Sequence, residues 1–340
     1  MTLGDGAWLC AFLASLAAVL AASDRLVRAV EAAGDHFAWP PALVGLVAAA
    51  GADGPEVTAA IISLIKGQHA VSLGVILGSN LFNLAALLGL PILLVGFVGA
   101  RRRGAALNGT TLIVVTLLAT LLVAGKLPVL LADGLVAAVL AAYASALLYG
   151  STGTAARLGS TAGGSSVEPD DGEAEEQRLR AREEDAAQGF PPGRRLLLVG
   201  LLATAVVIGG CTVLVNATLE LAPVVHLPHA WTGTFGLAIL TSLPNVWVAL
   251  ALARRGRGAV LVSAVCNSNT INLTFGICIP ALFTTMAPSA TVLHLDLPVL
   301  LLLSVLAVVL IWRNHGLGRR AAASLVVIYL AFAVIRTLIG

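Results

Sequence analysis

Ten stretches of this chain are long and apolar enough to cross a lipid bilayer as helices. A helix needs about 20 apolar residues to span the hydrocarbon core. The runs are apolar on every face, whereas a strand of a membrane barrel alternates apolar and polar residues. The sequence therefore predicts an all-α integral membrane protein with ten transmembrane helices. The expected spans are approximately 7–30, 39–65, 69–98, 105–125, 128–149, 195–218, 229–253, 258–287, 294–312 and 320–338.

The composition excludes a soluble fold. Hydrophobic residues make up 58% of the chain and charged residues 11%, and the mean hydropathy is +0.95. A soluble domain carries about 25% charged residues. The expected surroundings are therefore a lipid bilayer. The net charge of +2 averages an acidic segment against arginine clusters, so it gives no indication of a nucleic-acid partner.

A polar segment divides the chain into two halves of five spans each. Nine of the 18 acidic residues lie between Glu168 and Asp185, after a stretch rich in Gly, Ser and Thr. Such a composition is typical of a solvated linker. We expect a first half at 1–150, a flexible acidic linker at 151–194 and a second half at 195–340. A spacer is favoured over a regulatory role for this linker.

The placement of basic residues predicts the orientation, because cytoplasmic loops are enriched in Lys and Arg. Lys66, Lys126 and Arg336 are expected on one side. The other side carries Arg25, Arg28, Arg101, Arg102, Arg103, the linker arginines, Arg254, Arg255, Arg257, Arg313, Arg319 and Arg320. Both termini are then outside and the linker is cytoplasmic.

The first apolar run is expected to be retained as a span. The segment Met1–Gly6 contains Asp5 and no basic residue, whereas a signal peptide begins with a basic region. The compact chain shows no obvious eukaryotic targeting segment. We therefore expect a multi-pass protein of a bacterial inner membrane.

The two halves contain an internal repeat. A shift of 189 residues aligns Pro55 with Pro244, Ser79-Asn80 with Ser268-Asn269, and Asn83 with Asn272. The copies cover about 43–92 and 232–281, and five spans separate equivalent helices. Because five is odd, the copies cross the membrane in opposite directions. Inverted repeats of this kind build many secondary transporters, with the substrate site near the midplane.

Glycine and proline are expected to break the second and seventh spans. The expected breaks lie at Gly51, Gly54, Pro55 and Pro244. Proline leaves the carbonyl oxygen one turn earlier without a partner, and in lipid this costs several kcal/mol unless another group replaces the lost bond. A bound cation is one such group. The alternative is a kink that a neighbouring helix satisfies.

Two carboxylates stand at membrane depth beside the first break. Asp53 and Glu56 have i, i+3 spacing, which places them on one face of a helix. An acid within a span is a functional candidate, because its burial is expensive. The alternatives are a Glu56 that is stabilised only by the helix dipole and an Asp53 that reaches water.

Equivalent polar clusters occupy the third and eighth spans. They are Ser79, Asn80 and Asn83, and Ser268, Asn269 and Asn272. Their oxygens suit hard cations such as Na⁺ or Ca²⁺. Hydrogen bonding between helices is the alternative, but two clusters at equivalent positions favour a cation site.

No other pattern indicates a catalytic or cofactor site. The cysteines Cys10, Cys211, Cys266 and Cys278 have no metal-ligand spacing and are expected as small buried hydrophobes. No histidine belongs to an HExxH motif. We expect neither an enzyme nor a bound cofactor, and inorganic cations as the transported species. The sequence does not predict any protein partner.

With these motifs the chain resembles the sodium/calcium exchanger family. The family's two α-repeats read roughly G-T-S-L-P-E and G-S-N-I-F-N. This chain has Gly51-Ala-Asp-Gly-Pro-Glu56 with Gly78-Ser-Asn-Leu-Phe-Asn83, and Leu240-Thr-Ser-Leu-Pro-Asn245 with Asn267-Ser-Asn-Thr-Ile-Asn272. The resemblance implies antiport of Ca²⁺ or another cation against Na⁺ or H⁺. Monovalent exchange and a non-transporting, ion-sensing scaffold remain alternatives.

The resemblance also implies roles for individual residues. Glu56 matches the ion-binding acid of the first repeat, and Asn245 stands where the second repeat has its acid. The residues that match supporting ligands are Ser79, Asn83, Thr241, Ser242, Ser268 and Asn272. Asp53 replaces a hydroxyl residue of the family pattern. The number of carboxylates stays at two if Asp53 points into the site.

Overall fold

A computed structural model describes residues 3–36, 52–100, 102–160, 193–224 and 231–339, which are almost entirely helical. In this part of the chain eight helices are long and apolar enough to cross a membrane. They are Gly6–Leu26, His69–Val95, Gly104–Val123, Val129–Leu147, Leu198–Leu221, Gly258–Ala281, Val292–Asn314 and Arg319–Ile339. The expected all-α membrane architecture is confirmed.

The two remaining predicted spans are described only in part or by shorter helices. Of the span at 39–65, the structure describes α3 (Gly54–Ile65) and the two residues before it. The span at 229–253 contains the π-helix η2 (Thr232–Leu237) followed by α11 (Ala238–Arg254). The total of ten spans stays a prediction.

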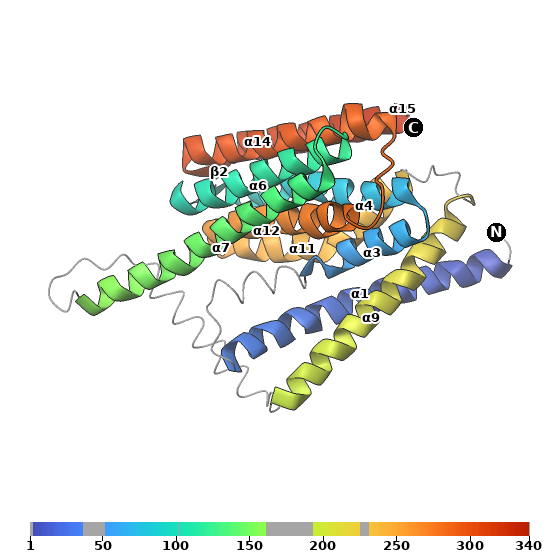
Figure 1. The fold of residues 1–340 in the computed structure, drawn as a ribbon, viewed down its shortest axis with the longest axis horizontal. Helices are drawn as coiled ribbons and strands as arrows, with labels where there is room; N and C mark the ends of the chain where they lie inside the picture. The colour runs from blue at the N-terminus through green and yellow to red at the C-terminus, as the bar shows by residue number, and fades with distance from the viewer. Residues whose placement is uncertain (1–2, 37–51, 101, 161–192, 225–230, 340) are drawn as a thin grey trace.

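A continuous helix forms the centre of the bundle. It consists of α4 (His69–Phe82), the π-helix η1 (Asn83–Leu87) and α5 (Leu88–Val95). Nearly every side chain from Val71 to Leu88 is buried, although the segment is apolar enough to face lipid. Protein, not lipid, surrounds this helix because α3, α11, α12 and η2 all pack against it (Figure 1).

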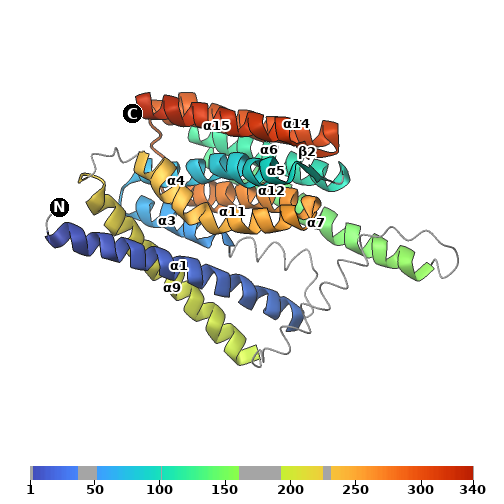
Figure 2. The same cartoon turned by 180° about the vertical axis from the view of Figure 1, so that it is seen from behind.

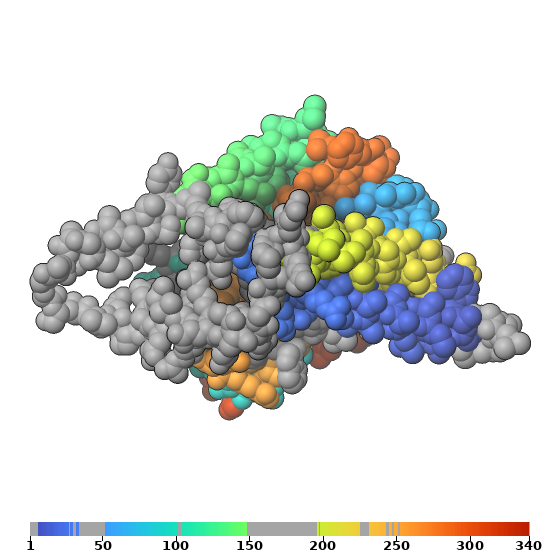
Figure 3. Space-filling view, turned by 90° about the horizontal axis from the view of Figure 1, so that it is seen from below, coloured from blue at the N-terminus to red at the C-terminus, as the bar shows by residue number. Residues whose placement is uncertain are grey.

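Helices α1 (Leu3–His36) and α9 (Gly193–Leu221) form a separate layer on one flank. They pack along each other and reach the rest of the bundle mainly through α3 (Figures 1 and 2). In Figure 3 they lie next to each other at the surface, α1 in blue and α9 in yellow-green. Many side chains of this pair are exposed, as expected for helices that face lipid.

The other helices complete the bundle on the opposite flank. Their bounds are α6 (Arg102–Val123), α7 (Val129–Ser160), α12 (Gly258–Leu273), η3 (Thr274–Cys278), α13 (Ile279–Ala281), η4 (Val292–Asp296), α14 (Leu297–Asn314) and α15 (Arg319–Ile339). Helix α7 continues through 151–160, which the sequence assigns to the linker. Extending a formed helix adds one hydrogen bond for each residue that is fixed. The helix that forms in the apolar span therefore continues through residues 151–160, past the end of the apolar run.

A short antiparallel ribbon joins two turns at one end of the bundle. Strand β1 (Phe97–Gly99) pairs with β2 (Gly316–Gly318), with Val98 opposite Leu317. Gly316 has a φ of 153° and a side chain there would lie 2.2 Å from the Val98 carbonyl oxygen, so this position requires glycine. Strands of three residues carry too little periodicity to be predicted from sequence.

A buried ion pair connects α15 to the start of α14. Arg336 Nε lies 3.1 Å from Asp296 Oδ1, and the two side chains are 2% and 0% exposed. From the sequence, Arg336 is expected at a membrane end, opposite the arginine-rich side. It is instead inside the protein, where the carboxylate compensates the cost of burying its charge.

Three of the four cysteines are buried as predicted, but Cys10 is exposed. Cys10 lies on α1, which has few neighbours in the bundle, so its side chain remains on the outer face of that helix.

Candidate cation site

Asp53 and Glu56 lie at the start of α3, in the interior of the protein. Asp53 occupies the N-cap position and Pro55 the first turn, where proline is tolerated because its missing N–H would have no helical partner. The i, i+3 spacing places both acids on one face, as predicted. Asp53 is 2% exposed and Glu56 0%. The alternative that Asp53 reaches water is therefore wrong.

Each carboxylate accepts a hydrogen bond from a serine of the second half. Ser268 Oγ on α12 donates to Asp53 Oδ1 at 2.7 Å. Ser242 Oγ on α11 donates to Glu56 Oε1 at 3.0 Å. The two acids of the first half and the two serines of the second half thus form one buried cluster.

The other oxygen of each carboxylate has no partner. Asp53 Oδ2 and Glu56 Oε2 are buried and accept no hydrogen bond. Among the described residues the ion pairs are Asp24–Arg28 and Asp296–Arg336, so no described basic side chain pairs with either acid. Two buried carboxylates without a cation are strongly unfavourable. The cluster therefore favours a bound positive charge.

Neutral polar groups surround the carboxylates. The Ser268 hydroxyl that donates to Asp53 also accepts a hydrogen bond from Asn83 Nδ2 at 3.1 Å. Ser79 Oγ, Asn83 Oδ1 and both polar atoms of Asn272 are buried without partners. Hydroxyl and amide oxygens are the neutral ligands that hard cations take. A cation at this point would satisfy oxygens that the protein leaves unpaired.

Asn80 and Asn269 bind each other reciprocally. Asn80 Nδ2 donates to the Asn269 carbonyl oxygen at 3.4 Å, and Asn269 Nδ2 donates to the Asn80 carbonyl oxygen at 3.1 Å. The two residues are separated by 189 positions, the shift that aligns the sequence repeat. These two hydrogen bonds connect α4 to α12 beside the carboxylates.

Other predicted site residues are less directly involved. The Thr241 hydroxyl donates to the Leu237 carbonyl oxygen, at the end of η2, at 2.8 Å. Asn245, which stands at the position of the family's second acid, is only half-buried, and the structure gives it no hydrogen bond among the described residues. Gly51 lies outside the described residues.

The expected helix break at Pro244 is not present. Helix α11 runs from Ala238 to Arg254 through this position. The irregular turn is the π-helix η2, which ends before α11 begins. Proline predicts a lost hydrogen bond but not where the helix takes up the distortion.

Close packing and π-helices near the site were not predicted. A side chain at Gly78 would lie 2.2 Å from the Thr234 carbonyl oxygen in η2, and one at Gly276 would lie 2.2 Å from Ile76 Cδ1. Helix η1 starts at Asn83, and η3 starts two residues after Asn272. π-Helical turns are frequent at functional sites, but they depend on tertiary packing and leave no simple sequence pattern.

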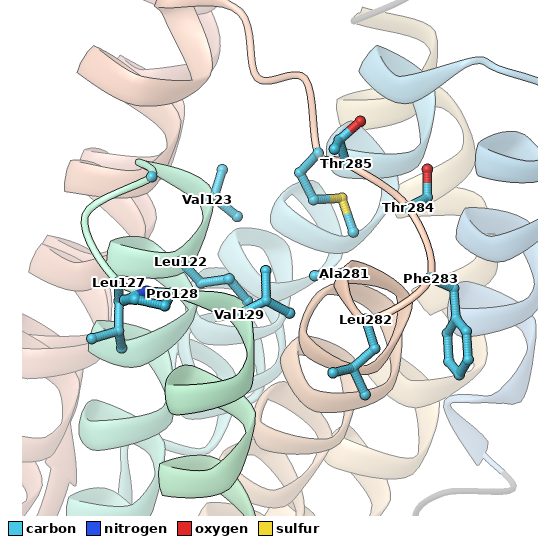
Figure 4. A pocket seen from close by; sticks show the side chains of 12 residues that line it. Leu122, Val123, Leu127, Pro128, Val129, Ala281, Leu282, Phe283, Thr284 and Thr285 are labelled. Atoms are coloured by element: carbon cyan, nitrogen blue, oxygen red, sulfur yellow. The ribbon is translucent and has the colours of Figure 1, made fainter.

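A cavity of about 520 Å³ lies elsewhere, between the α6–α7 turn and residues 281–286 (Figure 4). None of the predicted site residues lines it. Nearby in the sequence, Asp133 on α7 is not among the predicted site residues, but both of its carboxylate oxygens are buried without a hydrogen bond. Asp133 does not line this cavity, and no hydroxyl or amide group among the described residues donates a hydrogen bond to its carboxylate.

Comparison with known families decides the class of the protein. The sequence profile described as "Sodium/calcium exchanger protein" matches residues 7–152 and 195–338. The chain belongs to the sodium/calcium exchanger family. The resemblance found in the α-repeats is thereby confirmed. The two matched segments of this exchanger homologue leave out residues 153–194.

Relatives of similar length support this assignment. The inner membrane protein YrbG of Escherichia coli is 28% identical over 312 residues, which cover 89% of this chain and 88% of YrbG. A structure of the H⁺/Ca²⁺ exchanger CAX aligns with a TM-score of 0.66 at 16% identity, over 98% of this chain and 86% of that one. A structure of the sodium-calcium exchanger NCX_Mj aligns with a TM-score of 0.62 at 18% identity, over 96% and 98%. The chain therefore has the exchanger fold and is a multi-pass membrane protein with a bacterial inner-membrane relative.

Proposed function

We propose that this protein is a secondary cation antiporter that exchanges Ca²⁺, or another cation, against Na⁺ or H⁺. The observation that carries the proposal is the pair of buried carboxylates at Asp53 and Glu56. Each has one oxygen held by a serine of the other half and one oxygen without a partner. Family membership and the names of the CAX and NCX_Mj exchangers support antiport over an enzymatic role.

Asp53 takes the place of the missing acid of the second repeat. Asn245 is neutral and half-buried, while Asp53 lies beside Glu56 in the same cluster. The site then keeps two carboxylates, which together balance one divalent cation. Neutral oxygens of Ser79, Asn83 and Asn272 supply further ligands.

Transport would proceed by alternating access of one site between two inverted five-helix halves. The reciprocal bonds between Asn80 and Asn269 relate the halves by the same 189-residue shift as the sequence repeat. Hydrogen bonds from Ser242 and Ser268 connect each acid to the opposite half. A cation that replaces these contacts would change how the halves hold together, which couples binding to movement.

The test is uptake of radiolabelled Ca²⁺ into proteoliposomes under an outward Na⁺ gradient and, separately, an outward H⁺ gradient. One gradient should drive uptake. Glu56→Gln and Asp53→Asn should each abolish it, because either change leaves one carboxylate to balance a divalent charge. Asp133→Asn is the matched control. It removes a buried carboxylate of α7 that lies outside the site, and uptake should persist.

The variants separate the alternatives. Loss of uptake with Glu56→Gln alone would leave a one-carboxylate site and exclude the role assigned to Asp53. Absence of Ca²⁺ uptake under both gradients, in folded protein, would contradict the assignment of Ca²⁺ as a substrate. Na⁺/H⁺ exchange would then be measured, and its absence would favour the alternative of a non-transporting, ion-sensing scaffold.

A further inference from the structure

A polar junction of four side chains joins α6, α7 and α12 outside the candidate site. The Tyr143 hydroxyl on α7 donates to Asn108 Oδ1 on α6 and to Asn267 Oδ1 on α12, each at 2.8 Å. Asn108 Nδ2 in turn donates to Ser263 Oγ on α12 at 2.6 Å. Tyr143 and Asn108 are each 5% exposed. A polar group without a partner costs several kcal/mol inside a membrane, so these bonds hold the three helices in one arrangement.

The junction ends one residue before a group of the candidate site. Asn267 is followed by Ser268, whose hydroxyl donates to Asp53 Oδ1 at 2.7 Å. Consecutive residues of an α-helix point about 100° apart, so the bonds at Asn267 and Ser268 hold α12 from two directions. A rotation of α12 by about 10° would move an atom about 5 Å from its axis by about 0.9 Å. A shift of that size is enough to break the bond between Ser268 and Asp53.

The equivalent position of the first half carries no side chain. Asn267 and Gly78 are related by the 189-residue shift of the repeat. Gly78 lies against the Thr234 carbonyl oxygen of η2, so close backbone packing holds α4 at this point. In α12 a hydrogen-bonded side chain stands at the same position, and Tyr143 is its partner. The rotation of α12 therefore depends on a residue of α7, a helix that is largely exposed.

We propose that Tyr143 is a positioning residue of the cation site, which acts through Asn267 and Ser268 to orient the Asp53 carboxylate. Ser268 holds Asp53 Oδ1, and Oδ2 stays free for a cation. Without the Tyr143 hydroxyl, α12 is free to rotate and the carboxylate loses its fixed orientation. Cation binding must then restrict the carboxylate, which lowers the affinity. The inference rests on the proposed function in taking Asp53 as a cation ligand.

The test is a double-mutant cycle of Tyr143→Phe and Ser268→Ala in the full-length protein in detergent. Titration calorimetry gives the Kd for Ca²⁺, and thermal unfolding gives the Tm of the cation-free protein. Tyr143→Phe should raise the Kd about two- to twelvefold, the range that one neutral hydrogen bond supports. In the Ser268→Ala background the same change should alter the Kd less than about twofold, because the bond through which Tyr143 acts is already missing.

Tyr329→Phe is the matched control. Tyr329 on α15 is 8% exposed, and its hydroxyl is buried without a hydrogen-bond partner. The removal of this hydroxyl should leave the Kd unchanged and should not lower the Tm. Asn267→Ala is a second variant that removes the bond between α7 and α12 from the other side. It should reproduce the Kd of Tyr143→Phe.

The outcomes distinguish this inference from the proposed function. An unchanged Kd in Tyr143→Phe, or an equal fold-change with and without the Ser268 hydroxyl, would overturn the inference even if Ca²⁺ uptake is observed. A Kd that depends on Tyr143 only when Ser268 is present would support it, even in a protein that fails to exchange Ca²⁺.

If the unmodified protein binds no Ca²⁺, the proposed function fails and the Tm values decide the inference. The Tm loss in the double variant should be smaller than the sum of the two single losses, because both changes weaken the same contact between α12 and Asp53. Additive losses would show that Tyr143 and Ser268 act independently and would overturn the inference.

Discussion

The Ser268 hydroxyl joins three polar groups of the site. It donates to Asp53 and accepts from Asn83, so it orients a carboxylate and an amide together. Ser268→Ala should raise the KM for Ca²⁺ about tenfold or more, because a hydrogen bond to a charged group contributes about 1.5–3 kcal/mol. The measurement is the Ca²⁺ concentration dependence of uptake into proteoliposomes.

Thr270→Val provides the comparison within the same helix. The Thr270 hydroxyl is buried but donates to the Cys266 carbonyl of α12 at 2.9 Å, away from the acids. Its removal should leave the KM unchanged. Equal KM values for the Ser268→Ala variant and the unmodified protein would show that this hydroxyl does not orient the site.

Single-residue roles were predictable to the extent that spacing determines them. The i, i+3 spacing placed Asp53 and Glu56 on one face, where both are buried, and the repeat pointed to Ser268 and Asn83, whose side chains bond each other in the structure. Their role as cation ligands stays a prediction. The partner of each acid was not predictable. The serine that reaches each carboxylate depends on how α11 and α12 rotate against α3, and a single sequence gives no measure of that rotation.

At the scale of helices, glycine sets how closely α4 approaches η2. The first atom of a side chain at Gly78 would lie 2.2 Å from the Thr234 carbonyl oxygen, a backbone atom that cannot rotate away. Gly78→Ala should therefore destabilise the protein by about 1–3 kcal/mol, the usual range for overpacking. Thermal unfolding in detergent measures this as a lower Tm.

The control substitution is Gly134→Ala on α7, where a side chain would meet nothing within 4 Å. Its Tm should be unchanged or slightly higher, since alanine favours a helix over glycine by up to about 1 kcal/mol. If Gly78→Ala unfolds at the same temperature as the control, α4 and η2 are less tightly packed than the structure indicates.

The apolar runs predicted most helices within a few residues because lipid imposes the length of a span. They did not predict the π-helices η1, η2 and η3, nor that α11 runs through Pro244. These features depend on how one helix fits against another. Hydropathy reports the environment of a segment but not its local winding.

At the scale of the whole molecule, the first and last described helices share one end of the bundle. Helix α1 begins and α15 ends at one end, whereas α7 ends and α9 begins at the other (Figures 1 and 2). The ribbon β1–β2, which precedes Arg319 and Arg320, lies at the end where α7 ends and α9 begins. This arrangement agrees with arginines gathered on the side of the linker.

The orientation follows from that asymmetry and is open to a direct test. Because basic loops remain in the cytoplasm, we expect the linker inside and both termini outside. Alkaline phosphatase, which is active only outside the cytoplasm, should be active when fused after residue 340 and inactive when inserted after Gly172. A β-galactosidase fusion, active only inside, should give the opposite pattern at both points. Phosphatase activity at the linker would show that the protein is inserted in the opposite orientation and would contradict the assignment from the arginines. Because the sequence predicts two inverted halves, either orientation is geometrically acceptable, and the arginines must decide which one is inserted.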